Sequence, residues 1–207
     1  MNQTLLNQKS VGGQYFEQMF AENDDPWAMR HRWYERRKRA LLLACLPREH
    51  YSAIFEPGCA NGETSLALAG RCDSLLSFDL NARAVELTRQ QLADVPYAQV
   101  RQGILPGDWP SESFDLIVLN ELGYYLNTAD LSQLIDQALK SLKPGGQLVA
   151  CHWREEIEGC PLTAEQVHAQ LDQQLQMHKL VEHVEPDFYL TLWARDAASV
   201  AQVEGLR

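Results

Sequence analysis

The sequence predicts an α/β fold in which helices cover a mostly parallel sheet of seven strands. From about Ser52 onward, short apolar segments alternate with helical patterns, which is typical of parallel strands joined by helices. A glycine-containing turn follows the first of these segments, as at a ligand-binding edge of such a sheet. Two strand-like segments joined by a minimal turn near the C-terminus indicate an antiparallel hairpin added to the sheet edge.

Five apolar segments are the expected parallel strands, at residues 52–57, 74–79, 98–103, 114–119 and 146–153. Helices are expected between them near residues 62–70, 82–93 and 129–142. The last of these helices has apolar residues at i, i+3 and i+4 spacing, which marks a buried helix face. We expect it to end in a turn over residues 143–146, where a proline and two glycines occur together.

The two ends of the chain complete the expected domain. A helix over residues 163–177 begins at a capping box formed by Thr163 and Gln166. The hairpin strands follow at residues 179–186 and 188–195, with their turn near Asp187. A further helix over residues 31–45 packs on the sheet or closes the top of a pocket. We expect one domain over residues 1–207, with an N-terminal helical lid region (1–50), a core (51–195) and a tail (196–207).

Composition narrows the function classes. No apolar segment approaches the roughly 20 residues that span a bilayer, and the N-terminus lacks the pattern of a secretory signal, so we expect a cytoplasmic protein without membrane contact. The five cysteines are odd in number and lack C-x-x-C spacing, which favours free thiols over disulfides or a metal site.

The charge pattern argues against nucleic acid as a partner. The formal net charge is −10, whereas binding to phosphates requires a basic surface. Residues 30–39 are an exception with six basic side chains. We favour a solvated helix face for this segment over a rim that attracts an anionic substrate.

Polar residues follow several expected strands, and the carboxyl ends of parallel strands form the ligand crevice of such sheets. The first strand ends in Glu56-Pro57-Gly58, and the loop continues to Gly62; the two glycines allow a sharp turn and close approach of a ligand. Asp79 ends the second strand, where a carboxylate can accept hydrogen bonds from both hydroxyls of an adenosine ribose. The fourth and fifth strands lead into further polar positions, Asn120-Glu121 and His152-Trp153.

The glycine turn differs from the fingerprint of dinucleotide-binding proteins. That fingerprint is G-x-G-x-x-G, but Ala60 takes the second glycine position here and Glu63 takes the third. Glu63 would repel a pyrophosphate, whereas S-adenosylmethionine carries no phosphate. The turn therefore disfavours NAD and FAD.

The motifs together resemble those of class I S-adenosylmethionine-dependent methyltransferases, which have a Rossmann-like fold. They are E-x-G-x-A-x-G at residues 56–62, Asp79, FDLIVLNELGYYL at 114–126 and LKPGGQLV at 142–149. The chain also resembles the NodS-like group, whose namesake N-methylates the free amine of a chitooligosaccharide. That narrower resemblance rests on five features: DPW at 25–27, WYERRK at 33–38, LNELGYYL at 119–126, HWR at 152–154 and His168.

The resemblance implies a cofactor site for S-adenosylmethionine. Gly58, Ala60 and Gly62, preceded by Glu56, would surround the methionine part, and Ala60 stands where glycine is commoner. Asp79 would hold the ribose with Leu80 against the adenine, while Gly103 and Ile104 would flank the adenine edge. Asn120 would lie beneath the sulfonium, and Trp27 would close the site from the N-terminal lid.

Methyl transfer is an in-line displacement in which the enzyme aligns the nucleophile and excludes water. An amine acceptor must be neutral when it attacks, and a nearby base assists its deprotonation. Glu121 and His152 are the candidate catalytic residues, because both should point into the crevice from strand ends. Each residue has an alternative role. Glu121 would anchor the acceptor, and His152 would form a hydrogen bond with a backbone carbonyl.

The expected acceptor-binding residues are Tyr34, Tyr124, Trp153 and His168. One of Tyr124 and Tyr125 is expected in the pocket and the other in the core, without an indication of which. Trp153 either stacks on a sugar ring or fills space, and His168 either contacts the acceptor or lies on the surface.

The leading functional hypothesis is N-methylation of a small-molecule amine, and the resemblance implies an amino sugar or glycan precursor. Methylation of a hydroxyl or carboxylate is the first alternative, and a cofactor-binding module without catalysis is the second. A nucleic-acid methyltransferase is disfavoured by the net charge. The protein would act as a monomer or a homodimer.

Overall fold

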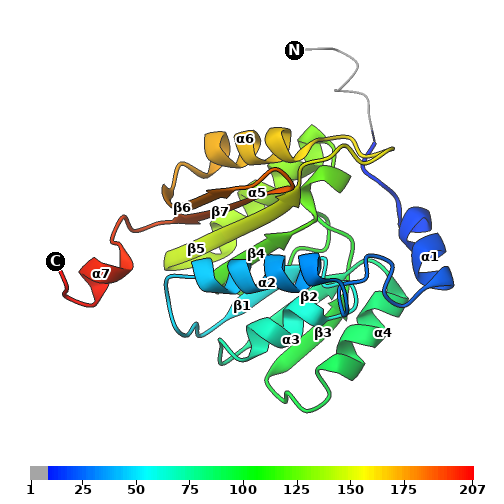
Figure 1. Cartoon of the computed structure of the whole chain (residues 1–207), viewed down its shortest axis with the longest axis horizontal. Coiled ribbons are helices and arrows are strands. Elements are labelled where there is room, and N and C mark those ends of the chain that lie inside the picture. Colours follow the sequence, from blue (N-terminus) through cyan, green and yellow to red (C-terminus); the bar gives the residue numbers. More distant parts are fainter. Residues whose placement is uncertain (1–8) are drawn as a thin grey trace.

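The computed structural model describes residues 9–207 and contains a seven-stranded sheet with helices on its two faces (Figure 1). The strand order is β3-β2-β1-β4-β5-β7-β6. Neighbours among the first five strands are parallel, whereas β7 runs antiparallel to β5 and to β6. The strands are β1 (Ile54–Pro57), β2 (Leu75–Asp79), β3 (Ala98–Gln102), β4 (Phe114–Asn120), β5 (Leu142–Trp153), β6 (His178–Val184) and β7 (Phe188–Ala194). The predicted mostly parallel sheet with a C-terminal hairpin is confirmed.

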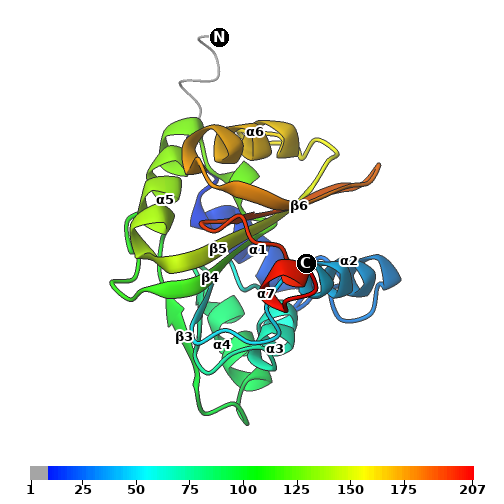
Figure 2. The same cartoon turned by 90° about the vertical axis from the view of Figure 1, so that its left-hand side faces the viewer.

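Two apolar cores lie on opposite faces of the sheet, and different helices cover them (Figure 2). Successive residues of a strand point to opposite faces, so Ile117 and Leu148 face α5 and α6, while Leu116 and Val149 face α2 and α3. Strands buried on both faces read as nearly continuous apolar segments, which explains the sequence pattern. The helices are α1 (Gly13–Glu22), α2 (Trp33–Cys45), α3 (Glu63–Ala69), α4 (Ala82–Gln91), the 3₁₀ helix η2 (Gly123–Tyr125), α5 (Thr128–Ser141), α6 (Ala164–Leu175) and α7 (Val200–Val203).

The strand order places a ligand crevice at the carboxyl ends of β1, β2 and β4. The chain moves from β1 outward to β2 and β3, and then returns to the other side of β1 to form β4. The loops that leave β1 and β4 therefore diverge, which opens a crevice at this edge. Asp79 ends β2, and Asn120 and Glu121 follow from β4 at the same edge.

The connection from α5 to β5 differs from its prediction. A turn was expected over residues 143–146, but β5 begins at Leu142, directly after α5. Phe114 pairs with Leu142 and Leu116 pairs with Gln147, so the intervening residues form a bulge in β5. The proline and glycines interrupt the ladder without ending the strand, which is how such residues act inside sheets.

The N-terminal segment covers the carboxyl edge of the sheet. The backbone N–H of Val11 donates to the carbonyl of Tyr125 at 2.8 Å, and Phe16 packs edge-on against the Tyr125 ring with centroids 5.0 Å apart. Phe20 packs against Trp27 in the same manner at 5.7 Å. Residues 1–8 of the expected lid region lie outside the described residues. Between residues 9 and 207, every helix is too short or too polar to cross a membrane.

Candidate active site

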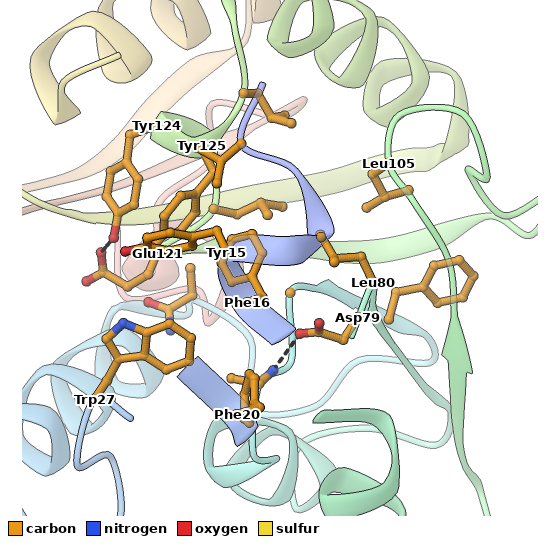
Figure 3. A pocket seen from close by; sticks show the side chains of 18 of the residues that line it. Tyr15, Phe16, Phe20, Trp27, Asp79, Leu80, Leu105, Glu121, Tyr124 and Tyr125 are labelled. Atoms are coloured by element: carbon orange, nitrogen blue, oxygen red, sulfur yellow. Dashed lines mark hydrogen bonds between the residues drawn. The ribbon is translucent and has the colours of Figure 1, made fainter. Parts of the chain in front are cut away.

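A cavity of about 990 Å³ lies between the carboxyl edge of the sheet and the N-terminal segment (Figure 3). Its volume is at the upper end of the range for small-molecule sites, which is roughly 300–1,000 Å³. Aromatic side chains of α1 and η2 line one part, and the loop after β1 and the end of β2 line another. The cavity therefore joins an aromatic part to a part formed at the ends of β1 and β2.

The loop after β1 approaches the cavity in a left-handed backbone conformation. Gly58 has φ of +79°, Ala60 of +50° and Gly62 of +82°. A Cβ atom at Gly62 would lie 2.9 Å from the Cα of Thr88, so only glycine fits there. Gly58 and Ala60 line the cavity, whereas Gly62 begins α3 and holds the loop in place.

Asp79 lies at the cavity wall directly beside this loop (Figure 3). Its two carboxylate oxygens accept hydrogen bonds from the backbone N–H groups of Ala60 at 3.0 Å and Asn81 at 2.9 Å. Burial raises the pKa of Asp79 to about 6. Each oxygen retains a further lone pair, so the carboxylate can accept two hydroxyl groups of a ligand.

Glu56 does not face the cavity, although it was predicted to bind the cofactor. Its buried carboxylate accepts hydrogen bonds from Ser65 and, at 3.0 Å, from Ser77. Burial raises the pKa of Glu56 to about 7. Ser65 lies in α3 and Ser77 lies in β2, so these hydrogen bonds link both elements to Glu56 in β1. Glu56 thus stabilises the base of the glycine loop.

The other predicted cofactor residues lie at the cavity. Leu80, Gly103 and Ile104 line it, and a Cβ atom at Gly103 would lie 3.0 Å from the ring of Phe78. Asn120 lines it as well.

Trp27 lines the cavity from the N-terminal segment. Asp25, two residues before it, accepts hydrogen bonds from the Met29 N–H at 2.7 Å and the Asn61 amide at 2.8 Å. Asp25 thus joins the segment that carries Trp27 to the glycine loop.

Glu121 carries the densest set of polar contacts in the cavity. Its carboxylate accepts hydrogen bonds from the Lys38 ammonium at 2.5 Å, the Tyr124 hydroxyl at 2.5 Å and the Trp153 backbone N–H at 2.9 Å. The residue also has φ of +54°, a conformation that is unfavourable for a side chain with a Cβ atom. Such strain persists where surrounding contacts fix it, often at functional sites. Three donors from three elements hold this carboxylate in one orientation.

Lys38 is a site residue that the sequence analysis missed. It lies in the basic segment 30–39, yet it is buried, and its ammonium lies between Glu121 and Glu35, which is 3.1 Å away. Burial acts to lower the pKa of Lys38, but the two carboxylates raise it overall. The sequence spacing could have indicated this position. Lys38 is four residues from both Tyr34 and Leu42, so the three side chains share one helix face, and apolar Leu42 marks that face as buried.

The aromatic residues predicted for the acceptor lie around this cluster. Tyr34 and Trp153 line the cavity and pack edge to face, with ring centroids 5.3 Å apart. Tyr124 and Tyr125 both line the cavity, whereas only one was expected there. Burial raises the pKa of Tyr34 and of Tyr124, so both remain hydroxyl donors at neutral pH.

His152 and His168 are buried and do not line the described cavity, contrary to the expectation that they face the crevice or the acceptor. The Gly123 N–H donates to His152 Nε2 at 3.0 Å, so His152 Nδ1–H donates to His168 Nε2 at 3.1 Å. His168 Nδ1 then donates to Thr191 at 3.1 Å. The alternative partner for His152, a backbone carbonyl, and a surface position for His168 are also wrong. Burial lowers both pKa values to about 3.

A family model and curated relatives match this chain. The model described as Nodulation protein S (NodS) matches residues 13–183. Nodulation protein S of Rhizobium tropici is 32% identical over 128 residues, which are 61% of this chain and 54% of that protein. Nodulation protein S of Bradyrhizobium diazoefficiens is 29% identical over 65% of each chain. The aligned region thus spans less than two thirds of these curated relatives.

Solved structures agree with this family. A candidate methyltransferase from Pseudomonas syringae is 61% identical, with a TM-score of 0.72, over 79% of this chain and 100% of that chain. The N-methyltransferase NodS from Bradyrhizobium japonicum, in complex with S-adenosyl-L-homocysteine, is 29% identical with a TM-score of 0.79, over 87% of this chain and 96% of that chain. With the family model covering most of its length, the chain belongs to the NodS family of class I S-adenosylmethionine-dependent methyltransferases.

Proposed function

We propose that this chain transfers the methyl group of S-adenosylmethionine to the amine of a small acceptor, such as an amino sugar or glycan precursor. The observation that carries the proposal is the position of Glu121, whose fixed carboxylate faces the same cavity as Asp79 and the glycine loop. The cofactor supplies a methyl carbon that the sulfonium has already activated. Glu121 and its neighbours therefore need only bind and align the acceptor.

The cofactor half of the cavity suits an adenosine without phosphates. Asp79 offers two carboxylate oxygens to the ribose hydroxyls, and Leu80 and Ile104 offer apolar contact to the adenine. Gly58 and Ala60 leave room beside the loop for the methionine part, with Asn120 and Trp27 near the sulfonium.

The charged side chains that line the cavity favour a cationic acceptor. Apart from Asp79, the cavity is lined by four carboxylates (Glu17, Glu35, Glu121 and Asp130) and two basic side chains (Arg32 and Lys38). An excess of negative charge in a partly closed cavity attracts an ammonium group and disfavours an anionic acceptor. This surplus supports N-methylation over methylation of a carboxylate. Because His152 does not line the cavity, we propose that it takes no part in proton transfer. The amine instead loses its proton to water beside Glu121.

Replacing Asp79 with Ala tests the cofactor site. We expect calorimetric titration with S-adenosylhomocysteine to give micromolar binding to the wild type. Loss of the carboxylate should weaken this binding by about 2 kcal/mol, or roughly 30-fold, which is typical of a charged hydrogen-bond partner. Asp94→Ala changes an exposed aspartate and serves as the control. Well-folded wild-type protein that does not bind the ligand would contradict the methyltransferase proposal.

Replacing Glu121 with Gln tests the acceptor anchor. The amide keeps the shape of the carboxylate but removes its charge. The KM of an amine acceptor should rise roughly 10- to 30-fold, about 1.5–2 kcal/mol, in a methyl-transfer assay, because a charged hydrogen bond is lost. Glu112→Gln, at an exposed ion pair with Arg101, is the control. An unchanged KM for amines, or transfer to hydroxyl acceptors only, would favour O-methylation, and cofactor binding without turnover would favour a non-catalytic module.

A further inference from the structure

The basic segment 30–39 contains two arginines that still have no assigned role. The structure pairs the other four basic side chains of this segment with carboxylates, which accounts for them within the fold. Among residues 9–207, Arg32 and Arg36 have no such ion-pair partner. The paired side chains are Arg30 and Arg39 with Glu63, Arg37 with Glu185, and Lys38 with Glu35 and Glu121.

Arg32 and Arg36 lie together at the start of α2, with an exposed indole between them in the sequence. The Arg36 N–H donates to the Arg32 carbonyl at 3.2 Å, so the two side chains are neighbours one helical turn apart. The Arg36 guanidinium lies over the Trp33 ring, 5.8 Å from its centroid, and Trp33 is 68% exposed. Like charges at this spacing repel each other, so an anion would stabilise the pair. We call these three residues the arginine rim.

The arginine rim continues from the cavity to the outer surface. Arg32 is exposed and also lines the cavity, whereas Trp33 and Arg36 are exposed beyond it. Lys38, which contacts Glu121, follows Arg32 by six residues, or about 9 Å along a helix axis. An acceptor whose amine lies beside Glu121 can therefore reach the rim with its other end.

We propose that the arginine rim binds a phosphorylated extension of the acceptor, which stays outside the cavity while the amine enters. This inference rests on the proposed function, in which Glu121 holds the amine. Guanidinium groups match the oxygens of phosphoryl groups in geometry and charge. The surplus of carboxylates disfavours an anion inside the cavity, so the phosphoryl group remains at the rim. The exposed indole offers a stacking surface for a planar ring, such as the base of a nucleoside diphosphate sugar.

Three amino sugars that differ in phosphorylation test the rim: D-glucosamine, D-glucosamine 1-phosphate and UDP-D-glucosamine. We expect the wild-type kcat/KM to be at least tenfold higher for each phosphorylated acceptor than for D-glucosamine. In the double variant Arg32→Gln/Arg36→Gln, which removes both charges, this preference should fall about fivefold or more. Arg89→Gln, at an exposed position of α4, is the control and should keep the wild-type preference.

The two phosphorylated acceptors separate the phosphoryl group from the base. Trp33→Ala should lower kcat/KM for UDP-D-glucosamine about fivefold relative to D-glucosamine 1-phosphate when the base stacks on the indole. An unchanged ratio would support binding of the phosphoryl group alone. Equal wild-type kcat/KM for all three acceptors, or an equal loss of preference in Arg89→Gln, would overturn the rim and leave amine methylation intact.

Binding of UDP gives a readout that does not depend on methyl transfer. Calorimetric titration of the wild type, loaded with S-adenosylhomocysteine, should show UDP binding that is at least fivefold weaker in Arg32→Gln/Arg36→Gln. Equal affinities, or no binding to the wild type, would overturn the inference. Absence of transfer to all three amino sugars, by protein that binds both S-adenosylhomocysteine and UDP, would instead overturn the proposed function.

Discussion

Replacing Lys38 with Met should lower the free energy of unfolding by about 3–5 kcal/mol, measured by denaturant titration. The substitution removes the cation between Glu35 and Glu121, whose side chains are only 12% and 21% exposed. Breaking a buried ion pair on one side leaves uncompensated charge, and its measured cost is of this size. Methionine is about as long as the aliphatic part of the lysine side chain. The lost free energy of unfolding would therefore come from the unpaired charges and not from a cavity.

The chain offers a matched control for this experiment. Lys179 also bridges two carboxylates, Asp172 at 2.9 Å and Glu182 at 2.7 Å, but its side chain and both partners are more exposed. Lys179→Met should cost about 0–1 kcal/mol, because solvent screens exposed ion pairs. Equal effects of the two substitutions would contradict a buried charge cluster at Lys38. The double variant Lys38→Met/Glu121→Gln should recover part of the loss, since it removes one of the two unpaired carboxylates.

The architecture was predictable because parallel strands leave a strong mark on the sequence. Strands buried on both faces appear as apolar segments, and polar residues appear where each strand ends. These two patterns located β1, β2, β4 and the hairpin to within a few residues. Helix α1 was not assigned as a helix, since its contacts with α4 and the Tyr125 ring come from distant parts of the chain.

The candidate site was predictable only for residues at the carboxyl ends of strands, where open α/β sheets bind their ligands. Gly58, Asp79 and Glu121 follow strand ends and lie at the cavity as expected. His152 also lies at a strand end, but neighbouring strand residues point to opposite faces. It shares its face with Ala150, toward α6 and the apolar core, and the sequence alone does not assign that face. Lys38 was assigned to the surface on the basis of charge, although tertiary contacts place it inside.

The buried histidines now have a role that no sequence pattern indicated. The chain of hydrogen bonds from Gly123 through His152 and His168 to Thr191 ties η2 to β5, α6 and β7. Helix η2 carries Tyr124, whose hydroxyl donates to Glu121. The histidines thus support the proposed acceptor anchor from behind, and they do so only in their neutral forms, because Gly123 needs an acceptor at His152 Nε2.

Replacing His168 with Gln should make the protein more resistant to acid. Glutamine offers one acceptor and one donor, as neutral His168 does, but it does not titrate. The pKa of His168 falls from 6.5 in the unfolded chain to about 3 in the folded protein because of burial. Between these values the unfolded state binds one proton more, so the wild type loses stability as the pH falls, by about 1.4 kcal/mol per pH unit.

At pH 4.5 this loss amounts to roughly 2–3 kcal/mol relative to pH 7, and the His168→Gln variant should escape it. Buried Asp79 and Glu56 act in the opposite direction, since their raised pKa values make the folded state take up protons first as the pH falls. They are present in both proteins, so the difference between the two unfolding curves isolates the histidine. His178→Gln, at an exposed position, controls for the loss of an imidazole. Parallel stability curves for wild type and His168→Gln from pH 7 to 4.5 would contradict a neutral buried histidine chain behind the acceptor anchor.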